Sequence, residues 1–460
     1  MVTQSVRWRV AGLVPRKWSR SLHPPDVSRR ELIGTAIAGA IPATATASRA
    51  TIKRRKPAPP GFLWGTAVSA YQSEGNNTNA DAWLMENIQP SMFKERSGDA
   101  CDSYHRYGED FAIAAKLGFN CYRLGVEWAR IEPSEGHFSN AELDHYARML
   151  EACRSHGLRP IVTLNHFTTP LWFAERGGFE VADAATIFAR YCREVAERLG
   201  GLMHMATTFN EANIRLLVGL FPQFNAALPL VKASVAAAAK ATNSPKFSRL
   251  AYADARVVTP IMQEAHRLGY VSIKEVRPDL PVGITLTTQD IQAPTPALVE
   301  HYRDRLYGDW IGIARSHADF FGVQTYTRFR FDEKGMLPPP PSAELTLSGY
   351  EYYPQALAST IRWAHRAIGK PIYVTENGIG THDDARRITF IDQALDGVRD
   401  CLDDGIPVHS YLYWSLLDNF EWTSGYAIPF GLVSVDRQDF DRMLKPSALH
   451  LGAIARSNRI

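Results

Sequence analysis

The chain has 460 residues, of which 45% are hydrophobic and 22% charged, with a formal net charge of +3. This length allows two domains or one large barrel, and the apolar fraction supports a sizeable core. Residues 1–60 contain 12 Lys and Arg against 2 Asp and Glu, a net of +10, so the remainder carries −7. The basic charge therefore belongs to the N-terminal tail, and nothing in the body of the chain predicts a nucleic-acid surface.

The first 47 residues resemble a twin-arginine export signal. A basic segment precedes Ser28-Arg29-Arg30-Glu31-Leu32-Ile33, a mildly apolar run follows from Gly34 to Ile41, and Ala45-Thr46-Ala47 is a small-residue candidate for the cleavage site. The run is too short to span a bilayer, which needs roughly 20 apolar residues. We expect the twin-arginine machinery to export the protein, making it periplasmic or extracellular. The alternative is an Arg-rich tail on a cytoplasmic protein.

Residues 48–60 are basic and rich in proline, and this composition predicts a stiff linker. From Gly61 onward, predicted strands alternate with predicted helices without a second change in composition. The predicted strands are Phe62–Thr66, Asn120–Leu124, Arg159–Leu164, Met203–Phe209, Val282–Thr287, Phe320–Thr325, Ile372–Thr375 and Ser410–Trp414. The clearest helical patterns are Asp110–Leu117, Ala141–His156, Ala184–Leu199, Pro354–Ile368, Ile388–Asp404 and Pro446–Ser457.

This alternation favours an α/β fold, a single (β/α)8 TIM barrel over residues 61–460. A doubly wound sheet would need a glycine-rich phosphate turn after the first strand, and Gly65-Thr66-Ala67-Val68-Ser69 is not one. Residues 212–281 are the least readable part. Helices are expected at Val231–Ala241 and Ala265–Val276, and Ala226–Phe247 reads as a long insertion over the active face. The barrel is thus expected to carry elaborated loops on its C-terminal face.

Five cysteines lie far apart in the chain, and no pair has the spacing of metal ligands. Their odd number implies no disulfide framework, so buried free thiols are the simplest interpretation. They are Cys101, Cys121, Cys153, Cys192 and Cys401. We predict neither a metal nor a cofactor.

Two predicted strands deliver a glutamate at their C-terminal ends, Glu211 after Asn210 and Glu376 after Thr375. A single buried carboxylate in such a place can be a structural ion pair or a helix cap. Two of them on the face where barrel enzymes carry their chemistry indicate glycoside cleavage. One carboxyl would protonate the leaving oxygen and the other would stabilise or capture the oxocarbenium-like centre. The residues alone assign neither the roles nor retention against inversion.

A series of short motifs runs through the body of the chain. They are Phe62–Gly75, Cys101–Tyr107, Tyr122-Arg123, Glu127–Ile131, Thr163–Phe167, Thr208–Glu211, Tyr373–Gly378 and Trp414–Trp422. In this order they resemble the signatures of glycoside hydrolase family 1, the β-glucosidase family, and they cover nearly everything after Gly61.

The resemblance implies a retaining, exo-acting β-glycosidase, most simply a β-glucosidase, that acts on terminal non-reducing β-D-glycosides by double displacement. Glu211 would be the acid/base and Glu376 the nucleophile. Arg123 matches the arginine that holds the nucleophile ionised, and Asn210 matches the donor to the sugar 2-OH. Tyr326 matches a tyrosine bonded to the nucleophile.

The resemblance also implies a sugar pocket. Gln72, His166 and Glu421 would hydrogen-bond the sugar hydroxyls, while Trp414 and Trp422 would cover its C–H face. Without the other motifs, His166 and Trp414 would each be interpreted as core residues. Glu421 favours an unphosphorylated sugar, because its carboxylate would repel a phosphate.

The chain departs from the family pattern at a few positions, including Ala212, Thr168-Thr169, Gln324 and Thr325. We expect these changes on the pocket wall and the leaving-group side, where they would affect the preferred substrate. The choice among glucosides, galactosides and fucosides stays open. Two other functions remain in view: a transglycosylase that uses the same residues, and a sugar-binding barrel without catalysis.

Overall fold

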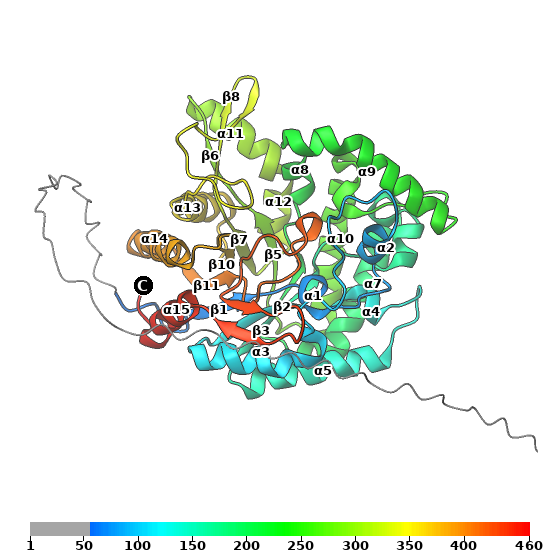
Figure 1. Cartoon of the computed structure of the whole chain (residues 1–460), viewed down its shortest axis with the longest axis horizontal. Helices are drawn as coiled ribbons and strands as arrows, with labels where there is room; N and C mark the ends of the chain where they lie inside the picture. Colours follow the sequence, from blue (N-terminus) through cyan, green and yellow to red (C-terminus); the bar gives the residue numbers. More distant parts are fainter. Residues whose placement is uncertain (1–55) are drawn as a thin grey trace, which may run out of the picture. The chain divides into compact units, whose positions relative to one another are not determined.

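The computed structural model describes residues 56–460 (Figure 1). The predicted export signal and residues 48–55 of the predicted linker lie outside the described residues. Eight parallel strands form a closed barrel in the order β1-β11-β10-β7-β5-β4-β3-β2. The strands are β1 (Leu63–Ala67), β2 (Cys121–Gly125), β3 (Arg159–Asn165), β4 (Met205–Phe209), β5 (Val282–Thr287), β7 (Phe320–Gln324), β10 (Ile372–Asn377) and β11 (Val408–Trp414). The predicted (β/α)8 barrel is confirmed.

Helices follow the strands and surround the barrel (Figure 1). The long ones are α3 (Ser103–Leu117), α5 (Asn140–Ser155), α7 (Ala184–Leu199), α10 (Ala255–Val276), α13 (Ala356–Ile368), α14 (Asp384–Asp403) and α15 (Pro446–Ser457). The shorter ones are α1 (Ala70–Glu74), α2 (Asp81–Asn87), α4 (Trp128–Ile131), α6 (Leu171–Glu175), α8 (Ile214–Val218), α11 (Pro296–Arg303) and α12 (Asp309–Ser316). Helix α9 (Pro222–Ala241) belongs to the insertion after β4.

Two small sheets accompany the barrel. One contains β6 (Asp290–Gln292), β8 (Arg328–Asp332) and β9 (Gly335–Leu337), and the other contains β12 (Val433–Val435) and β13 (Arg442–Leu444). In the first sheet, β6 follows β5 in the chain, and β8 and β9 follow β7. This sheet lies at the upper edge of Figure 1. Strands β6, β9, β12 and β13 have three residues each, too few to show a period-two pattern. Strand β8 does alternate, as Arg-Phe-Arg-Phe-Asp, but was not predicted.

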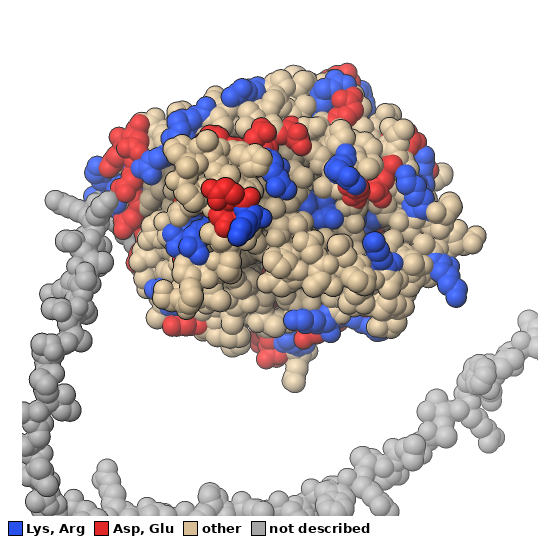
Figure 2. Space-filling model, turned by 90° about the horizontal axis from the view of Figure 1, so that it is seen from above, with Lys and Arg blue, Asp and Glu red and all other residues tan. Residues whose placement is uncertain are grey.

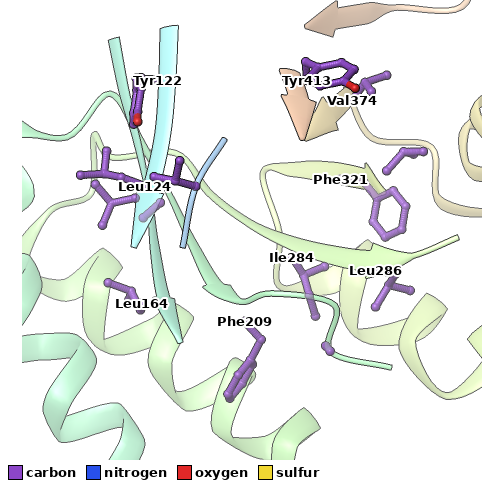
Figure 3. Close-up of a cluster of buried hydrophobic side chains, with 14 of the residues drawn as sticks. Tyr122, Leu124, Leu164, Phe209, Ile284, Leu286, Phe321, Val374 and Tyr413 are labelled. Atoms are coloured by element: carbon purple, nitrogen blue, oxygen red, sulfur yellow. The ribbon is translucent and has the colours of Figure 1, made fainter. Parts of the chain in front are cut away.

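Apolar side chains fill the layer between strands and helices. Figure 3 shows members of this cluster from neighbouring strands, among them Leu124, Leu164, Phe209 and Ile284, all buried. Phe209 of β4 stacks on Phe188 of α7 with ring centroids 4.5 Å apart. This packing fixes the strand that carries Asn210 and Glu211 at its end.

Helices α9 and α10 begin well before their predicted starts, as α3 does at Ser103 rather than Asp110. Helix α9 begins at Pro222 rather than Val231, and α10 begins at Ala255 rather than Ala265. Each contains an interior proline, Pro229 or Pro260. An interior proline removes a helical hydrogen bond and reads as a boundary in sequence, whereas here the helices continue through it.

The register of strand β10 is irregular next to Glu376, one of the two glutamates predicted at strand ends. Its pairing with β7 shifts between Val374 and Glu376, and its pairing with β11 shifts between Val374 and Asn377. Such an irregularity changes the direction in which the following side chain points. Glu376 therefore lies within the strand rather than after it, at a place where the ladder is interrupted.

The last part of the predicted linker belongs to the packed body. The backbone of Lys56 pairs with Ile460 in both directions, at 2.7 and 2.8 Å, and the amide of Ala58 donates to Asn458 at 2.9 Å. The Lys56 ammonium also contacts Asp403 at 2.8 Å. The ordered domain thus begins at least five residues before Gly61.

On the face seen in Figure 2, Lys and Arg side chains are interspersed with Asp and Glu. Within residues 56–460, no helix combines the length and apolarity needed to cross a bilayer. In the same part of the chain, no group of three or more His, Cys, Asp or Glu side chains is placed to hold a metal ion.

Gly65 tests how tightly the barrel closes between β1 and β2. A Cβ at this position would collide with the backbone oxygen of Cys121, its register partner on β2. We expect Gly65→Ala to lower the free energy of unfolding by about 1–3 kcal/mol, because backbone oxygens cannot move aside without breaking the ladder. The midpoint of urea unfolding measures this. Gly312→Ala is the matched control, since its Cβ on α12 would meet open space and should not destabilise the protein. An unchanged midpoint in Gly65→Ala would contradict this account of the packing.

Candidate active site

A cavity of about 510 Å³ opens at the C-terminal ends of the barrel strands. Nine of the ten site residues predicted from the sequence line it: Gln72, His166, Asn210, Glu211, Tyr326, Glu376, Trp414, Glu421 and Trp422. The tenth, Arg123, lies beneath the lining and contacts two of them. The structure therefore brings together residues that lie up to 350 positions apart in the chain.

Glu376 is buried and receives three hydrogen bonds. Its Oε1 accepts from Nη1 of Arg123 at 2.5 Å and from Nε2 of Gln324 at 2.8 Å. Its Oε2 accepts from the hydroxyl of Tyr326 at 2.6 Å. Burial raises the pKa of Glu376, and the guanidinium and phenol oppose that rise because they stabilise the carboxylate. Hydrogen bonds from a cation and two neutral donors suit an ionised oxygen pair.

Asn210 is held by the same two donors. Its Oδ1 accepts from Nη2 of Arg123 at 2.5 Å and from Nε2 of Gln324 at 2.8 Å. Because the oxygen is fully engaged, the amide NH2 of Asn210 is the group left to donate toward the cavity. One arginine and one glutamine thus orient both the carboxylate and its neighbouring amide.

Glu211 stands in a different electrostatic setting. Among the described residues, no Lys or Arg forms an ion pair with it. Burial raises its pKa to about 8, and the negative charge of Glu376 adds to the rise. Its φ of 42° lies in the left-handed region, which non-glycine residues rarely adopt and which concentrates at functional sites. Its backbone amide donates to the hydroxyl of Thr285 on β5 at 3.1 Å, and this bond holds the strained turn.

The sugar-binding end combines a polar network with aromatic rings. Nε2 of Gln72 donates to the backbone oxygen of Phe420 at 2.9 Å and lies 3.3 Å from Oε2 of Glu421. The ring of His166 is nearly parallel to the rings of Trp414 and Trp422, with centroid distances of 5.6 and 6.4 Å.

Two of these groups have perturbed pKa values. Burial first, and then the charge of Glu376, raise the pKa of Glu421 to about 8. Burial lowers the pKa of His166 well below its usual value, and Arg123 adds to this effect. The imidazole is therefore neutral, and its buried Nδ1 has no hydrogen-bond partner within the described residues. Because Nδ1 is shielded, the other ring nitrogen of the neutral imidazole is the one available to bind a sugar hydroxyl in the cavity.

Gln324 was not among the predicted site residues, although the sequence marked it as a departure from the family pattern. It lies at the end of β7, and its Nε2 bridges Asn210 and Glu376. We assign it a positioning role, because it does not line the cavity itself.

The expectation that the departures lie on the pocket wall is wrong. Ala212, Thr168, Thr169 and Thr325 are all buried, and none of them lines the cavity. The hydroxyl of Thr168 donates to the buried carboxyl of Glu127 at 2.9 Å. These residues lie behind the residues that line the pocket and support them. Their place in a sequence motif did not show whether they would contact the substrate.

The outer half of the cavity is formed largely by the insertion after β4. Helices α8 and α9 contribute Ile214, Arg215, Leu217, Val218, Gln223, Phe224 and Ala227. Helix α9 is fixed against the segment after α2, since the Ser234 hydroxyl donates to the backbone oxygen of Pro90 at 2.7 Å. Figure 1 shows α8 and α9 together above the barrel, next to α2. The predicted insertion over the active face is therefore mainly helical.

Comparison with known proteins agrees with this architecture. The family model for glycosyl hydrolase family 1 matches residues 54–287 and 311–460. The β-glucosidase of Agrobacterium sp. is 28% identical over 456 aligned residues, which cover 86% of this chain and 95% of that protein.

Two solved structures are more similar in sequence. An apo structure of a β-glucosidase has 47% identity and a TM-score of 0.84, covering 86% of this chain and 98% of that one. A β-glycosidase has 43% identity and a TM-score of 0.82, covering 87% of this chain and 98% of that one. The chain belongs to glycosyl hydrolase family 1, and it is an O-glycoside hydrolase.

Proposed function

We propose that the enzyme is a retaining, exo-acting β-glucosidase with Glu376 as nucleophile and Glu211 as acid/base. The observation that carries these roles is the contrast between two buried carboxyls in one cavity. Glu376 contacts a guanidinium, while Glu211 contacts no cation and has a pKa of about 8. Two carboxyls in such different settings supply one ionised and one protonated group at neutral pH. The names of the relatives described above support the glucoside preference.

In the first step, a carboxylate oxygen of Glu376 attacks C1 of the sugar. The bond from C1 to the glycosidic oxygen breaks as Glu211 transfers its proton to that oxygen, and the aglycone leaves as an alcohol or phenol. The product is a glycosyl ester of Glu376 with inverted configuration. In the second step, Glu211 accepts a proton from water while the water oxygen attacks C1. The ester bond breaks, Glu376 leaves as a carboxylate, and the second inversion gives net retention.

The electrostatics allow Glu211 to change roles between the steps. The charge of Glu376 contributes to the raised pKa of Glu211, which keeps the acid protonated before attack. Esterification removes that charge, so the pKa of Glu211 falls and its carboxylate can act as the base.

The remaining residues suit recognition of one glucosyl unit. The free amide NH2 of Asn210 is available for the sugar 2-OH, a contact that strengthens in the transition state. Gln72, His166 and Glu421 offer donors and acceptors for the other hydroxyls, and Trp414 and Trp422 offer apolar faces. Recognition of one terminal unit is the exo-acting mode that the family resemblance implies.

Azide rescue tests the two roles. Glu376→Gly should lower hydrolysis of p-nitrophenyl β-glucoside by roughly 10⁴-fold or more, and added azide should restore turnover and give the α-glucosyl azide. Glu211→Gly should lose about 10²–10⁴-fold and give the β-glucosyl azide, because azide then attacks the glycosyl ester. Product configuration by NMR distinguishes the two. Glu127→Gln, a buried glutamate outside the cavity, is the control and should keep its activity within a few-fold. A β-azide from Glu376→Gly would reverse the assignment.

The pKa of Glu211 predicts the basic limb of the pH profile. The acid is available below about pH 8 and is lost as the pH rises through that value, so kcat/KM for phenyl β-glucoside should fall at higher pH. A dinitrophenyl β-glucoside should show a much weaker fall, because its leaving group needs no proton. Glu421 titrates in the same range, but its titration would affect both substrates alike. Equal basic limbs for the two substrates would exclude Glu211 as the group responsible.

We also propose that residues 1–47 direct export of the folded enzyme by the twin-arginine route. The Arg29-Arg30 pair, the short apolar run and the small-residue site after it support this. The five buried cysteines are unpaired, which suits a protein that needs no oxidation after transport. A reporter fused to residues 1–60 should reach the periplasm, and Arg29→Lys combined with Arg30→Lys should retain it in the cytoplasm. A reporter that stays inside the cell without these changes would contradict the proposal.

A further inference from the structure

The aglycone half of the cavity contains an arginine without an acidic partner. Arg215 of α8 lines the cavity, and its Nε donates to the backbone oxygen of Ala253 at 2.6 Å. Its guanidinium lies over the ring of Phe224, 4.8 Å from the centroid. Its Nη1 is buried and has no hydrogen-bond partner, and among residues 56–460 no carboxylate lies within ion-pair distance of this group.

The acidic residue whose charge acts on Arg215, Asp254, does not neutralise it. Asp254 follows Ala253 and is bonded instead to Arg256, whose Nη2 is 2.8 Å from Oδ2 of the aspartate. Burial lowers the pKa of Arg215, and the distant charge of Asp254 only partly opposes this. A half-buried cation with unused donors has lost solvation without gaining a counter-ion. Such a group is ready to accept an anion that enters the cavity.

A second arginine that lines the cavity, Arg249, differs from Arg215 because it has an acidic partner. Arg249 is only 3% exposed, and its Nε lies 3.5 Å from Oδ2 of the fully buried Asp81. It also lies over the rings of Tyr252 and Phe93, with centroids 5.0 and 5.5 Å from the guanidinium. Its charge is therefore compensated within the protein. Of the two arginines that line this half of the cavity, only Arg215 has a positive charge left for a ligand.

The surroundings of Arg215 define the rest of the ligand. The aglycone half is lined by aromatic rings, namely Phe93, Phe167, Phe224, Tyr252 and Tyr350. Aromatic walls favour a flat, apolar ring, which can stack or meet them edge to face. The Nε of Arg215 donates to Ala253 and its Nη1 is shielded, so Nη2 is the donor left for a carboxylate at the border of this wall.

The sugar end does not repel an anion strongly. It contains the carboxyls of Glu211, Glu376 and Glu421, and Arg123 neutralises the one that is ionised through direct contact. The other two have pKa values of about 8, so both are mainly protonated at neutral pH. Within the described residues, Arg215 is the cation of the cavity lining that has no acidic partner to offset it.

We propose that Arg215 selects β-glucosides whose aromatic aglycone carries a carboxylate, such as those of hydroxybenzoic or hydroxycinnamic acids. This inference depends on the proposed β-glucosidase function and specifies its substrate class. Arg215 acts on substrate binding and not on the reacting atoms. Its effect should therefore be confined to substrates that carry the anion.

The test compares carboxyphenyl β-glucosides, with the acid at the 2, 3 or 4 position, with their methyl esters. For at least one isomer we expect kcat/KM to be about 10-fold higher for the acid than for the ester, because a charge-assisted hydrogen bond replaces a neutral contact. Added salt should reduce this ratio. In Arg215→Met the ratio should fall to about 1, and in Arg215→Lys part of it should remain.

Lys232→Met is the matched control, since it removes one positive charge from an exposed position of α9 outside the cavity. It should leave the ratio unchanged. Hydrolysis of p-nitrophenyl β-glucoside, a neutral substrate, reports separately on the β-glucosidase function and on the folding of each variant. An acid-to-ester ratio of 1 or less for every isomer in the unmodified enzyme would overturn the inference without any variant. A ratio that survives in Arg215→Met would overturn it as well.

Discussion

The site depends on the contact between Arg123 and Glu376. Both side chains are buried, with 0% and 4% of their surfaces exposed, and their nitrogen and oxygen atoms are 2.5 Å apart. Removal of either partner would leave an uncompensated charge in the barrel, which typically costs about 3–5 kcal/mol. The same guanidinium holds the oxygen of Asn210, and the charge it stabilises on Glu376 raises the pKa values of Glu211 and Glu421. Burial is the main cause of both shifts, and the charge held by this ion pair adds to the rise in the pKa values of the other two carboxyls.

The two halves of the cavity differ in the kind of side chain that lines them: polar and hydrogen-bonded at the sugar end, mainly apolar at the aglycone end. The sugar end comes from the barrel strands and the loops directly after them, and its carboxyl and amide groups hydrogen-bond one another, although Nδ1 of His166 and Oε1 of Gln324 have no partner within residues 56–460. Such a network allows little variation, because one unpaired group would cost the whole desolvation penalty. The aglycone end comes from α8, α9 and neighbouring loops, and its walls are mainly apolar. Apolar contacts tolerate changes of size and shape, so this end can change its ligand without disturbing the chemistry.

This difference explains which parts could be predicted from sequence. Residues such as Glu211 and Glu376 stand in short motifs at strand ends, where position along the strand fixes position in the barrel. Gln324 also lies at a strand end. The direction of its side-chain amide depends on the neighbouring strand β10, however, and the sequence around Gln324 does not show which strand lies beside it. Arg215 lies in a segment whose apolar residues face a cavity, and their spacing does not distinguish a pocket from a core. The interior prolines of α9 and α10 hid helices that tertiary packing maintains.

The five cysteines give the enzyme a practical property. All are buried, and burial raises the pKa of each thiol, to about 12 for Cys101, Cys153 and Cys401. Since the thiolate is the reactive form, maleimides should not reach them while the barrel is folded. A single cysteine introduced at exposed Ala233 on α9 would then be the only site of labelling. A fluorophore there could follow the helix over the cavity during turnover, and slow modification of the native thiols would record the opening of the barrel itself.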